Sequence, residues 1–270
     1  MPAPTPPGRP RPRNPAPWSE RRPPLHPIAA RSLPLIPPTP PGPWIHLDSS
    51  PIPETGATLH LLRQGDAYSI QVGSNELMTN LDRRSEQALA SIACARLRDR
   101  PRARILIGGL GMGFTLRAAL AALGPEARVV VAELVPAVVA WARGPLAHLF
   151  GDSLDDPRVE IVVGDVTRLI QSGPERFDAI LLDVDNGPSG MTRRENDRLY
   201  DRWGLRRAHY ALTRGGILGI WSGKPDRRFK ARLRLHGFAV DEVRVRANGG
   251  ADGPRHVLWF GIRPEAGIGV

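Results

Sequence analysis

The sequence predicts an α/β protein with a mostly parallel, seven-stranded sheet that is covered by helices. Two observations lead to this fold class. From Arg104 to Trp221, apolar runs of strand length alternate with segments of helical length. A further segment of helical length follows, up to Leu235, and after it two strand-like runs follow each other directly. Strict alternation is typical of parallel sheets with a helix in each crossover, and the last two runs add an antiparallel hairpin.

Residues 1–43 differ from the rest of the chain in composition. They hold seventeen of the 29 prolines. Proline removes backbone donors, and a segment with few apolar groups cannot offset the entropy lost on ordering. We therefore expect 1–43 to be a disordered Pro/Arg-rich tail. The folded part then consists of a small N-terminal region over 44–102 and a larger domain over 103–265.

The small N-terminal region begins with a predicted hairpin. Thr58–Arg63 and Ala67–Val72 have the composition of strands, and the glycine-containing turn between them suits a tight connection. A further strand is expected over Asn75–Met78. Ser85–Leu97 then predicts a helix, because its apolar residues recur on one face.

The larger domain is expected to contain five alternating strand and helix units and a terminal hairpin. The expected parallel strands are Arg104–Ile107, Val129–Glu133, Val159–Val163, Ala179–Val184 and Ile217–Trp221. The expected helices are Phe114–Ala122, Pro136–Arg143, Val166–Gln171, Arg194–Ala211 and Pro225–Leu235. The hairpin strands are Val240–Val245 and His256–Ile262.

The formal net charge of +10 does not predict a nucleic-acid partner. Residues 1–45 carry six arginines and one glutamate, so half of the excess (+5) falls there. The other half is spread without a dense cluster or interleaved aromatic residues. No run of eighteen apolar residues is present, so we expect neither a membrane span nor a signal peptide. The single cysteine, Cys94, excludes an intrachain disulfide and favours a cytoplasmic location.

Ligands of such sheets bind at the carboxyl ends of the strands, so the residues that follow each strand are the candidates for a site. Gly109, Gly111 and Gly113 follow the first parallel strand, where they allow a tight turn and a close approach to a ligand. Close packing explains such glycines equally well. Glu133 ends the second strand, where a carboxylate can accept from ribose hydroxyls. A solvated charge is the alternative for Glu133.

Acidic residues also follow the next two strands. Asp165 could accept from an adenine amine, or it could be the N-cap of the following helix. Asp183 and Asp185 follow the fourth strand, and turn chemistry explains Asn186–Pro188 but not Asp183. Because all these residues fall at one edge of one sheet, we interpret them together as a nucleoside site.

These segments resemble the spermidine synthase family of aminopropyltransferases. The similar segments are Arg104–Arg117, Ala132–Val139, Val162–Asp165 and Phe177–Asp183 with Gly187 and Pro188. The resemblance covers about 55–264. It implies a Rossmann-like, S-adenosylmethionine-dependent methyltransferase fold with a small N-terminal β domain.

The resemblance also implies an activity and roles for residues. The family moves an aminopropyl group from decarboxylated S-adenosylmethionine, a co-substrate, to a polyamine or other amine. By resemblance the three glycines shape the donor site, Glu133 binds the ribose and Asp165 the adenine. Asp183 takes a proton from the attacking amine, while Gln87 and Asp185 bind the acceptor. No metal is needed, because a sulfonium is already a good leaving group.

Two positions depart from the family pattern. Gly111 falls where the family has an aspartate that holds the donor's ammonium, and Glu86 falls where it usually has tyrosine. A methyltransferase that uses intact S-adenosylmethionine, and a non-catalytic nucleoside-binding protein, are therefore alternatives. Against methyl transfer, generic methyltransferases have an acid where this chain has Ile107. We expect a small-molecule amine substrate, no nucleic acid and no membrane partner, and we allow for a homodimer.

Overall fold

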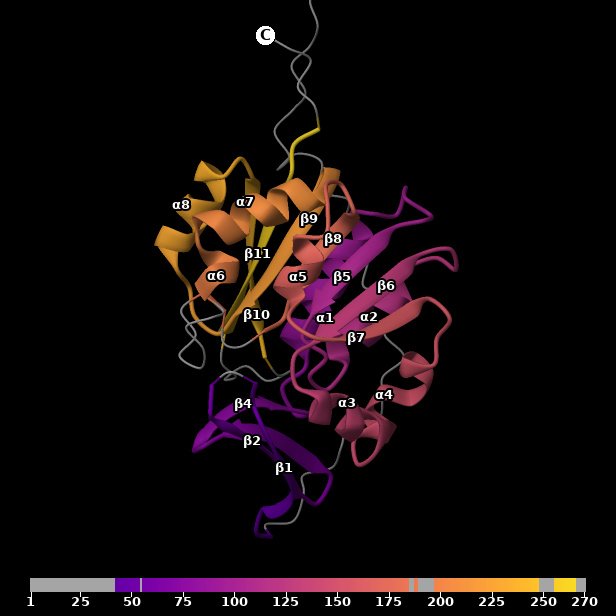
Figure 1. Ribbon diagram of the computed structural model, residues 1–270, viewed down its shortest axis with the longest axis vertical. Coiled ribbons are helices and arrows are strands. Elements are labelled where there is room, and N and C mark those ends of the chain that lie inside the picture. Colours follow the sequence, from indigo (N-terminus) through magenta and orange to yellow (C-terminus); the bar gives the residue numbers. More distant parts are fainter. Residues whose placement is uncertain (1–41, 54, 185–186, 189–196, 248–254, 266–270) are drawn as a thin grey trace, which may run out of the picture. The chain divides into compact units, whose positions relative to one another are not determined.

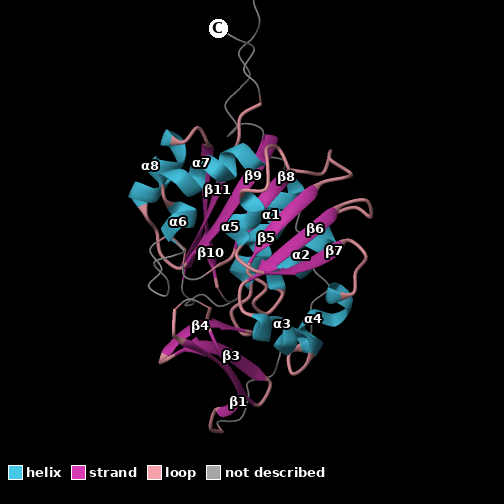
Figure 2. Cartoon of the chain, in the orientation of Figure 1, coloured by secondary structure: helices cyan, strands magenta, loops and turns pink. Residues whose placement is uncertain are grey.

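The computed structural model describes residues 42–53, 55–184, 187–188, 197–247 and 255–265. The tail expected over residues 1–43 lies outside this part of the chain, apart from its last two residues. The described residues contain a four-stranded and a seven-stranded sheet, with helices around the larger one (Figures 1 and 2).

The four-stranded sheet is antiparallel, and its strands are paired in chain order. They are β1 (Ile45–Pro51), β2 (Thr58–Gln64), β3 (Ala67–Val72) and β4 (Asn75–Thr79). Gln64 pairs with Ala67, so the β2–β3 hairpin closes through a two-residue turn in which Gly65 has φ +60°. The predicted hairpin is confirmed, whereas β1 was not predicted.

The seven-stranded sheet has the order β10-β11-β9-β8-β5-β6-β7. Its strands are β5 (Arg104–Gly108), β6 (Arg128–Glu133), β7 (Val159–Val163), β8 (Phe177–Leu182), β9 (Leu212–Ser222), β10 (Ala239–Arg246) and β11 (Arg255–Ile262). Strands β5 to β9 pair in parallel, and β11 lies antiparallel between β9 and β10. The predicted fold class, a mostly parallel sheet that ends in a hairpin, is confirmed.

Helices cover both faces of this sheet. They are α1 (Arg84–Ala95), α2 (Phe114–Ala122), α3 (Pro136–Arg143), α4 (Ala147–Phe150), α5 (Val166–Ile170), α6 (Asp197–Tyr200), α7 (Arg202–Ala211) and α8 (Arg227–Leu235), with a 3₁₀ turn over Gly151–Leu154. One face packs against α1, α2 and α3, and the other packs against α5, α6, α7 and α8 (Figure 1).

The buried strands β5 and β8 show why both faces are covered. Ile105 and Ile107 belong to the core beneath α1 and α2, while Leu106 belongs to the core beneath α5 and α7. Leu181 and Leu182 divide between the two cores in the same way. Successive side chains of a strand point to opposite faces, so a continuous apolar run needs a helical layer on each side.

The helix predicted over 194–211 is interrupted. Asp201 separates α6 from α7, and its Oδ1 accepts from the backbone amides of Trp203 and Gly204, 2.8 Å away in each case. This is the N-cap of a new helix. At Gly204 a β-carbon would lie 2.1 Å from the carbonyl oxygen of Arg198, so the two helices can pack this closely only because residue 204 has no side chain.

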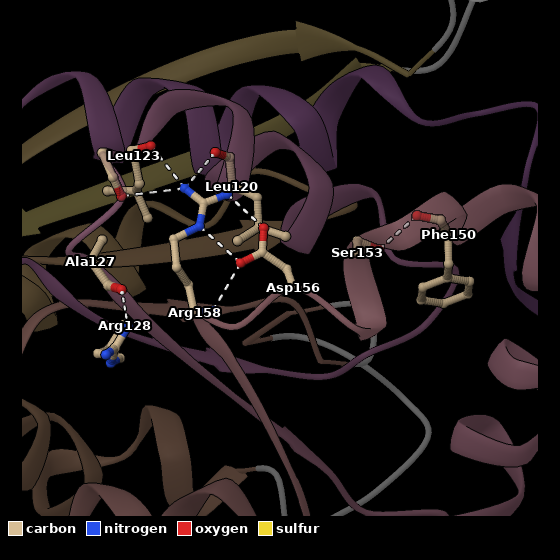
Figure 3. A network of polar contacts seen from close by, with 9 residues as sticks. Leu120, Leu123, Ala127, Arg128, Phe150, Ser153, Asp156 and Arg158 are labelled. Atoms are coloured by element: carbon tan, nitrogen blue, oxygen red, sulfur yellow. Dashed lines mark hydrogen bonds and ion pairs between the residues drawn. The ribbon is translucent and has the colours of Figure 1, made fainter.

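Arg158, just before β7, joins the sheet to the end of α2 (Figure 3). Its Nη1 donates to the carbonyl oxygens of Leu120 and Leu123 at 3.1 and 2.9 Å. Its Nε and Nη2 donate to both carboxylate oxygens of Asp156. The guanidinium hydrogen bonds lower the pKa of Asp156 to about 2. Helix carbonyls that lack an intrahelical partner are thereby satisfied by a cation.

Candidate active site

A cleft lies at the carboxyl ends of the parallel strands, with about 1070 Å³ of empty space that includes open solvent. The four-stranded sheet and the connection between β1 and β2 contribute apolar side chains, among them Ile52, Leu59 and Ile70. The loops after β5, β6, β7 and β8 contribute the residues on the opposite side. The strand ends predicted to carry the site therefore meet in one cavity.

The glycine loop after β5 lies close to the segment after β8. Gly109 has φ +91°, and a β-carbon there would lie 2.4 Å from the carbonyl oxygen of Asp183. Its backbone amide donates to the carbonyl of Ala132 at 2.9 Å. Any other residue at 109 would therefore be strained in its backbone and would collide with backbone atoms.

The other two glycines have different surroundings. Gly111 lines the cleft, and a β-carbon there would lie 2.6 Å from Cε of Met78. Gly113 precedes α2, and a β-carbon there would lie 2.4 Å from the ring of Phe150. Gly113 is not part of the cleft lining. Close packing, the alternative considered from the sequence, accounts for its lack of a side chain.

Glu133 lies at the end of β6, is only 7% exposed and lines the cleft. Its Oε2 accepts from the amide of Leu110 at 2.8 Å, and its Oε1 accepts from the amide of Val135 at 2.9 Å. Burial raises the pKa of Glu133, although these amide hydrogen bonds favour the charged form. The side chain thus ties the glycine loop to the neighbouring strand as well as facing the cavity.

Asp165 follows β7 and is the N-cap of α5. Its Oδ1 accepts from the amide of Thr167 at 2.8 Å. The residue also lines the cleft. Both interpretations considered from the sequence, a helix cap and a group in the site, are therefore compatible with its position.

Asp183 directly follows β8 and lines the cleft next to the glycine loop. Its backbone amide donates to the carbonyl of Gly108 at 3.0 Å, and the Thr115 hydroxyl donates to its Oδ2 at 2.6 Å. Burial raises the pKa of Asp183 to about 6, against the opposing effect of the Thr115 hydrogen bond. A carboxylate with this pKa is ionised at neutral pH and basic enough to accept a proton.

Glu86 is a second acidic residue next to Asp183. It lies in the first turn of α1, is 6% exposed and lines the cleft. Burial raises its pKa to about 8, and the negative charge of Asp183 contributes to the shift. The sequence marked Glu86 only as a departure from a family pattern; the structure places it beside the proposed base.

The geometry does not support the two residues that were predicted to bind the amine substrate. Gln87 is partly buried on α1 and does not line the cleft. Asp185 lies outside the described residues. Three residues of the site were not singled out from the sequence: Thr115, Met78 and Ser85. Their type gives no chemical signal, because each becomes significant only through the residue that it contacts.

The cleft contains acidic but no basic side chains among the described residues that line it. Its ionisable residues are Glu86, Glu133, Asp165 and Asp183. In the part of the chain that the structure describes, no helix has the length and apolar character needed to cross a membrane.

Comparison with known proteins gives consistent relatives. No protein-family model matches the chain. It is 29% identical over 193 residues to the polyamine aminopropyltransferase of Mycobacterium tuberculosis, and 31% identical over 126 residues to polyamine aminopropyltransferase 2 of Pseudomonas aeruginosa. The matches cover 68% and 45% of this chain but 35% and 34% of the relatives. The chain thus spans about a third of the length of these relatives.

Solved structures show the same fold. The spermidine synthase of Thermotoga maritima superimposes with a TM-score of 0.63 at 17% identity, over 81% of this chain and 72% of that one. A spermidine synthase in complex with the transition state analogue AdoDATO gives a TM-score of 0.65 at 19% identity, over 81% and 73%. The resemblance to the spermidine synthase family that the sequence predicted is confirmed.

Proposed function

We propose that this chain transfers an aminopropyl group from decarboxylated S-adenosylmethionine to an amine. The observation that carries the proposal is the charge of the cleft. Its ionisable side chains, as far as the structure describes them, are four carboxyl groups. Such a cavity favours cationic ligands and disfavours anionic ones. The donor and the acceptor of this reaction are both cations.

The same charge distinguishes between the two forms of the donor. Intact S-adenosylmethionine carries a carboxylate, which needs a cation or several free amides. Of the amides in the glycine loop, that of Leu110 already donates to Glu133. Decarboxylation removes the anionic group, so the remaining ligand matches the acidic lining. The family relatives, named as aminopropyltransferases, support the same choice.

We assign the nucleoside to the ends of β6 and β7. Glu133 faces the cleft with a carboxyl group that already accepts from the amides of Leu110 and Val135, and we assign the ribose hydroxyls to the same two oxygens. Asp165 uses Oδ1 as a helix cap, and its second oxygen is the acceptor for the adenine amine. Both residues line the cleft.

Asp183 performs the proton transfer. An amine that is protonated in water has no free lone pair, so it cannot attack until a base removes a proton. Asp183 accepts this proton, so an N–H bond of the amine breaks and an O–H bond forms on the carboxyl group of Asp183. The freed lone pair attacks the carbon next to the sulfonium, the C–S bond breaks, and its electron pair stays on sulfur as a neutral thioether. Thr115 holds the carboxylate in place throughout.

Met78 fills the space next to Gly111. Its methyl end occupies the space into which a side chain at 111 would project. An aspartate there would displace Met78, so the cleft has an apolar wall at this point, and the acidic groups at this end of the cleft are Glu86 and Asp183. The aspartate that the family has at position 111 is therefore absent, but another acidic residue, Glu86, lines the same cavity.

Calorimetric titration of the full chain with both donor forms tests the proposal. We expect decarboxylated S-adenosylmethionine to bind at least about tenfold more tightly, which corresponds to about 1.4 kcal/mol. Equal affinity, or tighter binding of intact S-adenosylmethionine, would argue against the proposed donor. S-adenosylhomocysteine and 5′-methylthioadenosine serve as the matched pair of product nucleosides, with and without the amino-acid group.

A further inference from the structure

Glu86 is held by a chain of hydrogen bonds that leads away from the cleft. The Ser85 hydroxyl donates to Oε2 of Glu86 at 2.6 Å. On its other side, Ser85 Oγ lies 2.9 Å from Nδ1 of His256 on β11. The His256 ring in turn packs edge-on against Trp221, with 4.6 Å between ring centroids, and Trp221 lines the cleft. The orientation of Glu86 is thus fixed by two residues behind it.

This chain is compatible with both protonation states of Glu86. When Glu86 is ionised, Ser85 donates to it and the Nδ1–H of His256 donates to Ser85. When Glu86 is protonated, it donates to Ser85, and Ser85 donates to an unprotonated Nδ1. A hydroxyl group can reverse in this way because it both donates and accepts. Glu86 can therefore gain or lose a proton without moving.

The empty cleft favours the protonated state. Glu86 is buried and Asp183 half-buried, and both line one cavity in which no described side chain is basic. Two neighbouring carboxylates that are shielded from water cannot both be charged without a penalty, and the charge of Asp183 favours the protonated form of Glu86. The charged groups near Glu86 are Asp183 and Asp82, both acidic, and the partly buried His256, whose pKa is lowered by burial. None of these supplies a compensating positive charge in the empty site.

We propose that Glu86 and Asp183 form a two-carboxyl site for one alkylammonium group, and that Glu86 releases its proton when the cation binds. The proposal rests on the proposed function, since it names the group of the amine substrate that this end of the cleft recognises. On binding, the O–H bond of Glu86 breaks, and the proton passes through Ser85 to His256 and then to solvent. One positive charge then lies between two negative ones.

The release of a proton determines how binding depends on pH. The amine stays protonated between pH 6 and 8, and Glu86 must ionise for it to bind. Amine affinity should therefore rise with pH by up to about tenfold per unit over this range, as expected for the release of one proton. A glutamate that served only to stabilise α1 would give no such dependence.

Calorimetric titration with 1,4-diaminobutane in phosphate and in Tris measures the proton release directly, because the two buffers differ in their enthalpy of ionisation. At pH 7 we expect nearly one proton released per amine bound by the unmodified chain. Glu86→Gln should abolish the release, flatten the pH dependence and weaken binding at pH 8 by about tenfold or more. Glu160→Gln, the same change at an exposed position of β7, is the matched control and should behave like the unmodified chain.

A second variant, Asp183→Asn, tests the proposal even if Glu86→Gln does not fold. In Asp183→Asn the neighbouring negative charge is absent, so more Glu86 is ionised before the amine arrives, and the proton release at pH 7 should shrink. Unchanged proton release in both variants would overturn the proposal, as would amine binding without release, or no amine binding, in the unmodified chain. Glu86-dependent release without aminopropyl transfer would contradict only the proposed function. Transfer with normal amine affinity in Glu86→Gln would contradict only this inference.

Discussion

Asp183→Asn separates the proton-accepting role of Asp183 from a structural one. The amide keeps the shape of the carboxylate, its oxygen can still accept from the Thr115 hydroxyl, and the backbone bond to Gly108 does not involve the side chain. The fold should therefore be retained, because removal of a half-buried charge offsets a weaker hydrogen bond from Thr115. Turnover should fall by about 10²–10⁴-fold, the usual contribution of a general base. This corresponds to about 2.7–5.4 kcal/mol in the activation barrier.

Asp178, at the other end of the same strand, provides the matched control. Its Oδ1 accepts from Arg100 Nη1 at 2.6 Å and from the Thr213 hydroxyl at 2.9 Å, and its Oδ2 accepts from the backbone amide of Arg104 at 2.8 Å. Asp178→Asn weakens this network and should lower the free energy of unfolding by about 1.5–3 kcal/mol. Because it does not line the cleft, turnover per folded molecule should stay unchanged.

The two variants are compared by urea unfolding and by the rate of nucleoside product formation at saturating substrates. The reasoning requires opposite patterns: lost turnover with retained stability for Asp183→Asn, and lost stability with retained turnover for Asp178→Asn. Equal and proportionate losses in both properties for Asp183→Asn would refute the catalytic assignment. Unaffected turnover in that variant would refute it as well.

Three further predictions concern ligand affinity, backbone geometry and pH. Glu133→Ala should weaken binding of 5′-methylthioadenosine by about 1.5–3 kcal/mol in calorimetry, because the carboxyl group that accepts from the ribose hydroxyls is lost, and unchanged affinity would show that β6 does not end at the ribose. Gly109→Ala should lower the melting temperature more than Gly73→Ala does. Both glycines have positive φ, but only a β-carbon at position 109 would collide with the Asp183 carbonyl. Equal decreases in melting temperature would show that this collision does not matter. The raised pKa of Glu86, about 8 against an ordinary 4.5, means that above about pH 4.5 the unfolded chain has lost a proton that the folded chain keeps, so stability falls toward pH 8. Thermal melts of Glu86→Gln should show a smaller fall over this range, and an identical slope would contradict the assignment.

Much of the large sheet could be predicted from the sequence, because its strands are buried on both faces. Val159–Val163 and the helices Phe114–Ala122 and Pro136–Arg143 have the predicted bounds. Strand β1 (Ile45–Pro51) could not be predicted in this way. It is paired only with β2 and is largely exposed, so burial imposes no alternating pattern on its residues.

The break between α6 and α7 has a different cause. The residues on either side of Asp201 each favour helix, and periodicity cannot show that one carboxylate caps the second segment. The cap becomes evident only when the backbone turns and the amides of Trp203 and Gly204 reach that side chain.

The candidate site could also be predicted only in part. Glu133, Asp165 and Asp183 could be predicted, because the carboxyl ends of parallel strands meet at one edge. Glu86 could not be assigned from the sequence, because it comes from a helix far from these strand ends in the chain. Its proximity to Asp183 results from the packing of α1 against the large sheet.

The central claim is that the chain transfers an aminopropyl group, and the nucleoside product tests it most directly. The full chain is incubated with 1,4-diaminobutane and each donor form in turn, and the products are identified by mass spectrometry. We predict 5′-methylthioadenosine and an aminopropylated amine from decarboxylated S-adenosylmethionine, and no product from the intact form. S-adenosylhomocysteine from intact S-adenosylmethionine would contradict the claim in favour of methyl transfer, and nucleoside binding without either product would contradict it in favour of a non-catalytic protein.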